Sequence, residues 1–290
     1  MKRGFITLAV GRDSYYELAH SLLMSYRNTN GSKYPWTLVC DRENLWTADF
    51  DNIIILEHPA KSYMDKLTLF GLVPYDECIF IDADCLVFSK LDSFWDRMDQ
   101  VEGFSCFGKP LPLDSQDGWF LIDDVGEWKQ HISFIPQMHG GICFLKKGEK
   151  LNRILYLAHQ IEENYNNYKF KYFDKPADEP ILALATAITM SRPIAAQEHD
   201  FLFLPSVSVR EQRNVILSNC ASFVTGKSAG AIRIIHYQNH NTEKTGYQVS
   251  RDILLYEKRN IHLRYVFYSL ADALRQFRRH LKRLWEKIKK

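Results

Sequence analysis

The hydrophobic pattern divides the chain into short apolar runs and longer stretches with helical spacing. Four apolar runs bounded by turn residues predict buried strands at 5–10, 36–40, 52–56 and 79–81. Apolar side chains at steps of three and four predict a helix over 15–28, which Asp13 or Ser14 would cap. This alternation predicts an α/β fold with a mostly parallel sheet flanked by helices. Such sheets bind ligands beyond the carboxyl ends of their strands.

Three more elements are expected in the second half. The pair Gly140-Gly141 precedes an apolar run and predicts a strand that begins after the glycines. A helix is expected over 181–190, with Asp178 as its N-cap or Glu179 as an acid in its first turn. A late strand is expected over 233–237.

The last part of the chain has a different pattern. From residue 263 apolar side chains recur at steps of three and four, which predicts one long helix with an apolar stripe. Residues 271–290 hold eight Lys or Arg and two acids, so this segment carries +6 in a chain whose net charge is +2. We interpret 251–290 as a basic amphipathic extension in which 263–290 contacts an anionic membrane surface. Packing on the preceding domain or on a second subunit is the alternative, and the oligomeric state stays open.

Composition narrows the class of protein. With 290 residues and 46% hydrophobic residues, the chain can form one large domain with a full core. The net charge gives no reason to expect a nucleic acid partner. Six isolated cysteines without a C-x-x-C pair argue against a zinc knuckle and fit a reducing cytoplasm. The N-terminal apolar run is too short for a signal peptide, and no apolar segment reaches 18 residues, so we expect a cytoplasmic protein.

The candidate chemistry begins with Asp82-Ala83-Asp84, which follows the apolar run at 79–81. Side chains two apart at a strand end project to the same side of the chain. Two carboxylates placed together require a cation, and a divalent ion whose open positions hold a diphosphate satisfies that need. A polar turn that caps a buried strand is the simpler explanation for an isolated Asp-x-Asp.

Two other strand ends suggest a mononucleotide site. Val10 and Asp41 end the first two predicted strands, and Tyr15 lies near the first. Tyr15 could stack on a base, and Asp41 could accept a hydrogen bond from a base or ribose. No G-x-G-x-x-G follows the first strand and no P-loop occurs, so metal and Lys or Arg must meet the phosphate charge.

The segment MDKLTLFGLVPYDECIFIDADCLVFSKLDSFW resembles the core of the family-eight, glycogenin-like glycosyltransferases. The resemblance covers roughly residues 4–240 and is strongest over 65–95. It implies the GT-A fold, a nucleotide-sugar donor that is usually UDP-linked, Mn²⁺ (or Mg²⁺), and transfer with retention. The implied domain is 1–250, with a nucleotide-binding part at about 1–90 and an acceptor part at about 91–250.

The resemblance also implies site residues. At the nucleotide it implies Ala9 and Val10 through their backbone, and Asp13 and Tyr15 beside base and ribose. At the diphosphate and metal it implies Lys66, Asp82, Ala83, Asp84 and His236, with Asp82, Asp84 and His236 as metal ligands.

In this family two further segments face the donor and acceptor sugars, and a third grips the diphosphate. Gly140 and Gly141 resemble the segment whose backbone faces the donor sugar. Asp178 and Glu179 stand in D-E-P-I-L-A, where the family has "D-Q-D-x-h-N", and are the candidate catalytic acids together with Lys66. Lys244 is the candidate cation of the closing loop, although the family's Gly then Lys-Pro-Trp is missing.

The resemblance predicts sugar transfer from a nucleoside diphosphate to an acceptor hydroxyl, in the synthesis of a cell-surface glycan. The basic C-terminal segment suggests a glycan or lipid-linked acceptor on a lipid carrier or at the cell envelope, and a peripheral position of the protein on the inner face of the membrane. One rival is an aspartyl phosphatase with a D-x-D nucleophile and a later acidic pair at Asp123-Asp124. Another is a non-catalytic nucleotide-sugar-binding module at a membrane.

Overall fold

The computed structural model describes residues 1–197, 200–203, 232–243, 247–248, 250–252 and, in the C-terminal segment, 266–268, 270–271, 273–275, 277–279, 281 and 285. The chain forms two compact units, which we describe separately. The first comprises Met1–Leu23, Ser32–Ala83 and Leu91–Glu198, and the second comprises Met24–Gly31, Asp84–Lys90 and His199–Lys290.

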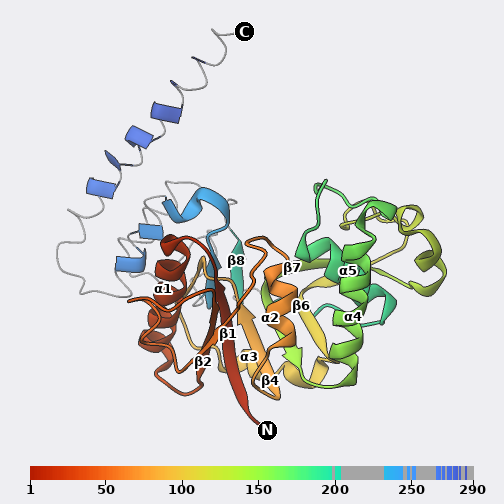
Figure 1. Ribbon diagram of the computed structural model, residues 1–290, viewed down its shortest axis with the longest axis horizontal. Coiled ribbons are helices and arrows are strands. Elements are labelled where there is room, and N and C mark those ends of the chain that lie inside the picture. The colour runs from red at the N-terminus through yellow and green to blue at the C-terminus, as the bar shows by residue number, and fades with distance from the viewer. Residues whose placement is uncertain are drawn as a thin grey trace. The chain divides into compact units, whose positions relative to one another are not determined.

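The first unit contains a mixed sheet of six strands in the order β3-β2-β1-β4-β7-β6. The strands are β1 (Arg3–Ala9), β2 (Trp36–Cys40), β3 (Asn52–Ile55), β4 (Glu77–Ile81), β6 (Phe104–Leu111) and β7 (Ile135–Lys146). The pairs β1–β2, β1–β4 and β2–β3 are parallel, and β7 runs antiparallel to both β4 and β6. The prediction of a mostly parallel central sheet is confirmed, and Figure 1 shows β1 beside β2 and β4.

Helices flank this sheet and bury its central strands. Every residue of β2 and β4 is buried, as expected for strands covered from two sides. The helices are α1 (Asp13–Asn30), α2 (Asp65–Gly71), α3 (Asp92–Trp95), α4 (Glu149–Glu163) and α5 (Asp178–Ile188). Helix α5 packs on β7 and α4, and α4 also contacts α2, so one apolar core joins these elements. Short 3-10 turns complete the described elements at Met98–Gln100, Ile122–His131, Tyr165–Asn167 and Asn239–Glu243.

Two local predictions are wrong. The glycine pair does not precede a strand but lies inside β7, which already begins at Ile135. Pairing with β6 holds this polar first half in the sheet, with a register shift between Cys106 and Phe107. Of the two alternatives for the start of α5, Asp178 as the N-cap is wrong, because Ala177 occupies that position and Asp178 begins the helix, whereas Glu179 lies in the first turn as predicted. The Asp178 carboxylate contacts another element instead.

The second unit has a three-stranded sheet in the order β5-β9-β8. The strands are β5 (Cys85–Val87), β9 (Ile234–His236) and β8 (Phe201–Phe203). Strand β9 runs antiparallel to β5 and parallel to β8. The C-terminal part of α1, from Met24 onward, belongs to this unit, and Ser25 Oγ accepts a hydrogen bond of 2.9 Å from the Val87 N–H.

The C-terminal segment is helical at the residues described between 266 and 285. Its apolar side chains are exposed, among them Leu274 at 63% and Trp285 at 61%. Arg279 Nη2 lies 2.7 Å from Glu243 Oε2, and Arg275 donates to the Glu243 carbonyl. A search of the described residues finds no helix whose length and apolar character would suffice to cross a bilayer.

Candidate active site

The first unit gathers six of the expected residues beyond the carboxyl end of β4. Asp82 follows the last residue of this buried strand, and its N–H donates to the Gly141 carbonyl at 2.9 Å. This bond extends the β4–β7 ladder by one residue and brings the backbone of the glycine pair to the strand end. The site therefore lies at the edge of the sheet where α/β folds bind their ligands.

Lys66 lies between two carboxylates at this edge. Its Nζ is 3.0 Å from both carboxylate oxygens of Asp82 and 3.0 Å from Asp178 Oδ2. The ammonium also lies 5.4 Å from the centre of the Phe80 ring. Burial alone would lower the pKa of Lys66, but the charges of Asp178 and Asp82 outweigh it and raise the pKa well above its ordinary value. Lys66 therefore stays charged at neutral pH.

The loop before α2 fixes the position of this lysine. Asp65 is buried, and its carboxylate accepts hydrogen bonds from the Ala60 and Ser62 N–H groups at 2.6 and 3.1 Å. The Lys66 N–H bonds to the Tyr63 carbonyl at 3.3 Å, so Lys66 lies in the first turn of the helix. A short, internally bonded turn thus directs the lysine into the site.

Glu179 has an unusual environment beside this pair. Its Oε1 accepts a hydrogen bond of 2.7 Å from the Gly140 N–H. Burial and the neighbouring Asp178 carboxylate raise its pKa to about 7, against the lowering effect of the Gly140 N–H. A Cβ at position 140 would lie 2.7 Å from Glu179 Cγ, so glycine is needed there for close approach. The site thus contains one carboxyl group that titrates near neutrality.

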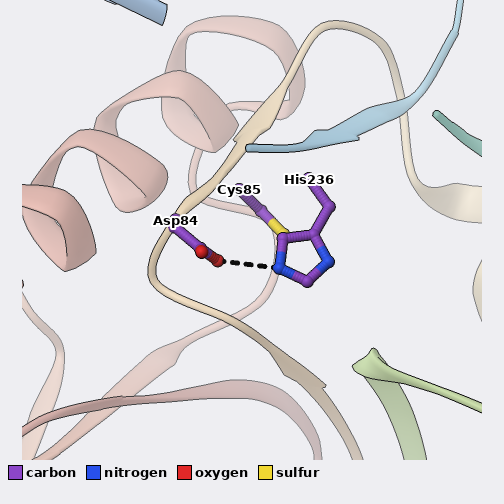
Figure 2. Close-up of side chains that lie close together, drawn as sticks. All are labelled: Asp84, Cys85 and His236. Carbon is purple, nitrogen blue, oxygen red and sulfur yellow. Dashed lines mark ion pairs between the residues drawn. The ribbon is translucent and has the colours of Figure 1, made fainter. Parts of the chain in front are cut away.

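The second unit brings together Asp84, Cys85 and His236 (Figure 2). The Asp84 carboxylate points toward the imidazole, with Oδ1 2.9 Å from Nε2. Cys85 and His236 are directly paired across β5 and β9, so their side chains lie on one face of the sheet. One ligand atom from each of the three residues lies within 4.8 Å of the others.

This donor set fits a divalent ion. A carboxylate oxygen and an imidazole nitrogen this close together, with the imidazole buried, can both turn to one metal. Among the described residues, Asp84, Cys85 and His236 are the group of His, Cys, Asp or Glu side chains that lie close enough together to hold one metal ion. Asp82, the third predicted ligand, belongs to the first unit and contacts Lys66 there.

Two of the predicted nucleotide residues, Asp13 and Asp41, contact an arginine that the sequence analysis missed. Arg42 Nη1 donates to the Gly11 carbonyl at 2.7 Å, and Nη2 lies 2.5 Å from Asp13 Oδ1. Asp41 accepts hydrogen bonds from the Tyr16 hydroxyl and, at 3.1 Å, from the Gly11 N–H. These bonds join the ends of β1 and β2.

The electrostatics of Asp41 follow from these bonds. Burial raises the pKa of Asp41. The hydrogen bonds from Tyr16 and Gly11 and the charge of Arg42 lower it by more than burial raises it, so the net shift of the pKa is downward. Asp41 is therefore ionised at neutral pH. Arg42 follows it directly in the sequence, and this adjacency is the signal that could have revealed the arginine.

The remaining predicted residues are less informative. Ala9 and Val10 are buried at the end of β1, whereas Tyr15 is 46% exposed and Ala83 is partly buried. Lys244 lies outside the described residues. The prediction of base, ribose and closing-loop contacts stays a prediction.

Solved glycosyltransferases share this fold. An active-site mutant of LgtC matches with a TM-score of 0.51 at 14% identity, over 81% of this chain and 87% of that chain. The galactosyltransferase LgtC in complex with donor and acceptor sugar analogs matches with a TM-score of 0.53 at 12% identity, over 92% of this chain and 96% of that chain. GlyE, a glycosyltransferase of Streptococcus pneumoniae in its apo form, matches with a TM-score of 0.52 at 12% identity, over 93% of this chain and 60% of that chain.

No protein-family model and no curated protein matches the sequence. At identities of 12 to 14% the likeness shows the fold. The first unit has the mostly parallel sheet flanked by helices that is typical of GT-A glycosyltransferases.

Proposed function

We propose that this protein is a glycosyltransferase that moves a sugar from a nucleoside diphosphate to an acceptor hydroxyl. The observation that carries this proposal is the buried Lys66 ammonium, held 3.0 Å from Asp82 and from Asp178 at the carboxyl edge of the sheet. If Lys66 only stabilised the fold, one carboxylate would be enough to pair with its ammonium. A second carboxylate, with Glu179 beside it, leaves a surplus of negative charge in this part of the site.

Each residue then has a role in the transfer. The bond between the anomeric carbon and the β-phosphate oxygen breaks, and its electron pair stays on the diphosphate. The anomeric carbon becomes electron-poor, and Asp178 stabilises that positive charge electrostatically. Lys66 holds Asp178 and Asp82 in place. The acceptor oxygen bonds to the anomeric carbon, and its proton goes to the departing diphosphate on the same face, which gives retention.

A divalent metal is part of the proposal because Asp84 and His236 fit one. When bound, the metal neutralises the charge that develops on the diphosphate. Asp84 and His236 would hold it, and we propose Asp82 as the third ligand. We propose Mn²⁺ or Mg²⁺ as the ion and a UDP-linked sugar as the donor, in line with the family resemblance.

Donor turnover tests this proposal. We expect the protein with Mn²⁺ to release UDP from at least one of UDP-glucose, UDP-galactose and UDP-N-acetylglucosamine, and Asp84→Ala to abolish that release while the protein stays folded. Asp123→Ala is the matched control, because Asp123 contacts Lys129 at the surface. Turnover of all donors at the wild-type rate by Asp84→Ala would reject the metal site.

The rival functions predict other results. A phosphatase that uses the pair Asp123-Asp124 would hydrolyse a simple phosphate ester and lose that activity in Asp123→Ala. A non-catalytic binding module would give a thermal shift with UDP-sugars and no release of UDP.

We propose a peripheral position on the inner face of the membrane, with a lipid-linked or surface glycan as the acceptor. Support comes from the exposed apolar side chains of the C-terminal helix and the cations Arg275, Arg278 and Arg279 among them. We expect co-sedimentation with phosphatidylglycerol vesicles and weak binding to phosphatidylcholine. The double variant Leu274→Asp, Phe277→Asp should lose this binding, and unchanged co-sedimentation would contradict the proposal.

A further inference from the structure

Four aromatic side chains form a continuous cluster on the first unit. The Tyr63 and Phe173 rings meet edge to face with centroids 6.4 Å apart, and the Trp119 ring lies 5.7 Å from that of Phe173. Tyr172 continues the cluster, with its ring 6.2 Å from that of Trp119. Tyr172 is 85% exposed and Tyr63 is 61% exposed, whereas Trp119 is anchored on the hydrophobic core. The cluster therefore presents aromatic rings to solvent from a fixed base.

The backbone of this cluster is held in an unfavourable conformation. Tyr172 has a φ of +68°, in the left-handed region that residues with a side chain rarely adopt. The neighbouring backbone is fixed on both sides, because the Lys171 N–H donates to the Trp119 carbonyl at 2.7 Å and the Tyr165 hydroxyl donates to the Phe173 carbonyl at 3.1 Å. Strain at an exposed aromatic residue points to a function for the ring rather than to a packing role.

The cluster adjoins the candidate active site through two segments. Tyr63 lies one turn before Lys66, and Phe173 lies five residues before Asp178. The two segments meet at the Tyr63–Phe173 ring contact and again at the Lys66–Asp178 ion pair of 3.0 Å. The aromatic surface and the charged site are thus successive contacts between the same two segments.

We propose that Tyr63, Trp119, Tyr172 and Phe173 form a binding site for a pyranose ring of the acceptor glycan. A pyranose has a face of C–H groups and a rim of hydroxyls. Its C–H face packs on the electron-rich face of an aromatic ring, and polar side chains beside the rings can bond the hydroxyls. Gln116, Lys171 and Asp174 supply such polar groups near the rings in the sequence, and Lys171 Nζ donates to the Gln116 carbonyl.

This inference rests on the proposed sugar transfer, yet it can be tested without it. Saturation-transfer NMR with methyl β-galactoside, methyl β-glucoside and lactose measures sugar binding directly. We expect Tyr172→Ala and Tyr63→Ala each to weaken binding about five- to tenfold, which corresponds to one aromatic contact. Tyr172→Phe keeps the ring and should bind as the wild type does.

The matched control is Tyr156→Ala, which removes another exposed tyrosine, from helix α4. It should leave both sugar binding and UDP release without acceptor unchanged. The proposal is overturned if none of the three sugars binds the wild type, or if Tyr172→Ala binds them as tightly as the wild type. Sugar binding without any UDP release would instead reject the proposed transfer and leave the binding site standing.

Discussion

Two strand ends of the first unit begin with the same pattern and differ in what their aspartates do. Asp41 follows the buried strand β2, and Asp82 follows the buried strand β4. Donors from its own neighbourhood satisfy Asp41, namely the Tyr16 hydroxyl and the Gly11 N–H. Asp82 instead shares the ammonium of Lys66 with a second carboxylate, Asp178.

The difference separates an anchoring carboxylate from a reactive cluster. Around Asp41 hydrogen bonds join the ends of two strands, and the low pKa of the carboxylate follows from them. Around Asp82 the acids outnumber the cations, and burial together with the neighbouring Asp178 carboxylate raises the pKa of Glu179 to about 7. Perturbed titration of this kind is typical of functional sites.

Removing the lysine of the Asp82 site should have the largest effect. Lys66→Met leaves two carboxylates without their shared cation, and we expect a loss of about 3 to 5 kcal/mol in the free energy of unfolding. Urea denaturation measures this loss. Lys61→Met is the matched control at the other strand end, because the exposed Lys61 Nζ lies 3.9 Å from Asp41 and should contribute less than about 1 kcal/mol. An equal loss of unfolding free energy in the two variants would contradict the proposed difference between the Asp82 and Asp41 sites.

The titration of Glu179 should make stability depend on pH. Its folded pKa of about 7 lies above the ordinary value of 4.5, so the folded protein holds this proton more tightly than the unfolded chain. The resulting stabilisation is complete below pH 4.5 and is lost as the pH rises through 7.

Glu179→Gln removes this titration. We expect it to unfold with a free energy about 2 to 3 kcal/mol higher than the wild type at pH 8, with a smaller difference at pH 5. Urea denaturation at both pH values gives the comparison, and a pH-independent difference would show that Glu179 titrates normally.

A methyl group placed against Glu179 tests the same difference between the Asp82 and Asp41 sites. Gly140→Ala places a methyl group 2.7 Å from Glu179 Cγ, and we expect a cost of about 1 to 3 kcal/mol with a shifted pH dependence. Gly71→Ala serves as the control, since a Cβ there meets nothing within 4 Å. Thermal unfolding of both variants is the measurement. A Gly140→Ala protein as stable as Gly71→Ala would mean that Glu179 moves aside freely.

The smallest effect is expected at the Asp41 site. Tyr16→Phe removes one hydrogen bond to the carboxylate, and we expect a loss of about 1 kcal/mol together with a higher pKa of Asp41. Tyr15→Phe changes an exposed neighbour and should have no effect on stability. The Asp41 pKa can be followed by NMR titration, and an unchanged value would assign its downward shift to the Gly11 N–H and Arg42.

The sequence predicted the sheet well because buried strands appear in it directly as runs of apolar residues. Strand β2 coincides with the prediction, and the other predicted parallel strands agree within two residues at each end. The errors fall where a distant segment decides the outcome. Strand β7 starts seven residues early because β6 pairs with its polar half, and Asp178 contacts Lys66 instead of capping α5.

Local residue order, together with the family resemblance, was enough to select the candidate acids, the lysine and the glycine pair, although the glycine pair lies inside β7 and not before it. The residues that they contact could not be predicted from the hydrophobic pattern. That Lys66 serves two carboxylates, that Glu179 needs a glycine opposite it, and that Cys85 faces His236 depend on contacts between residues far apart in the chain. Such contacts depend on how the strands and helices pack, and a single sequence records hydrophobic spacing far more directly than it records pairing.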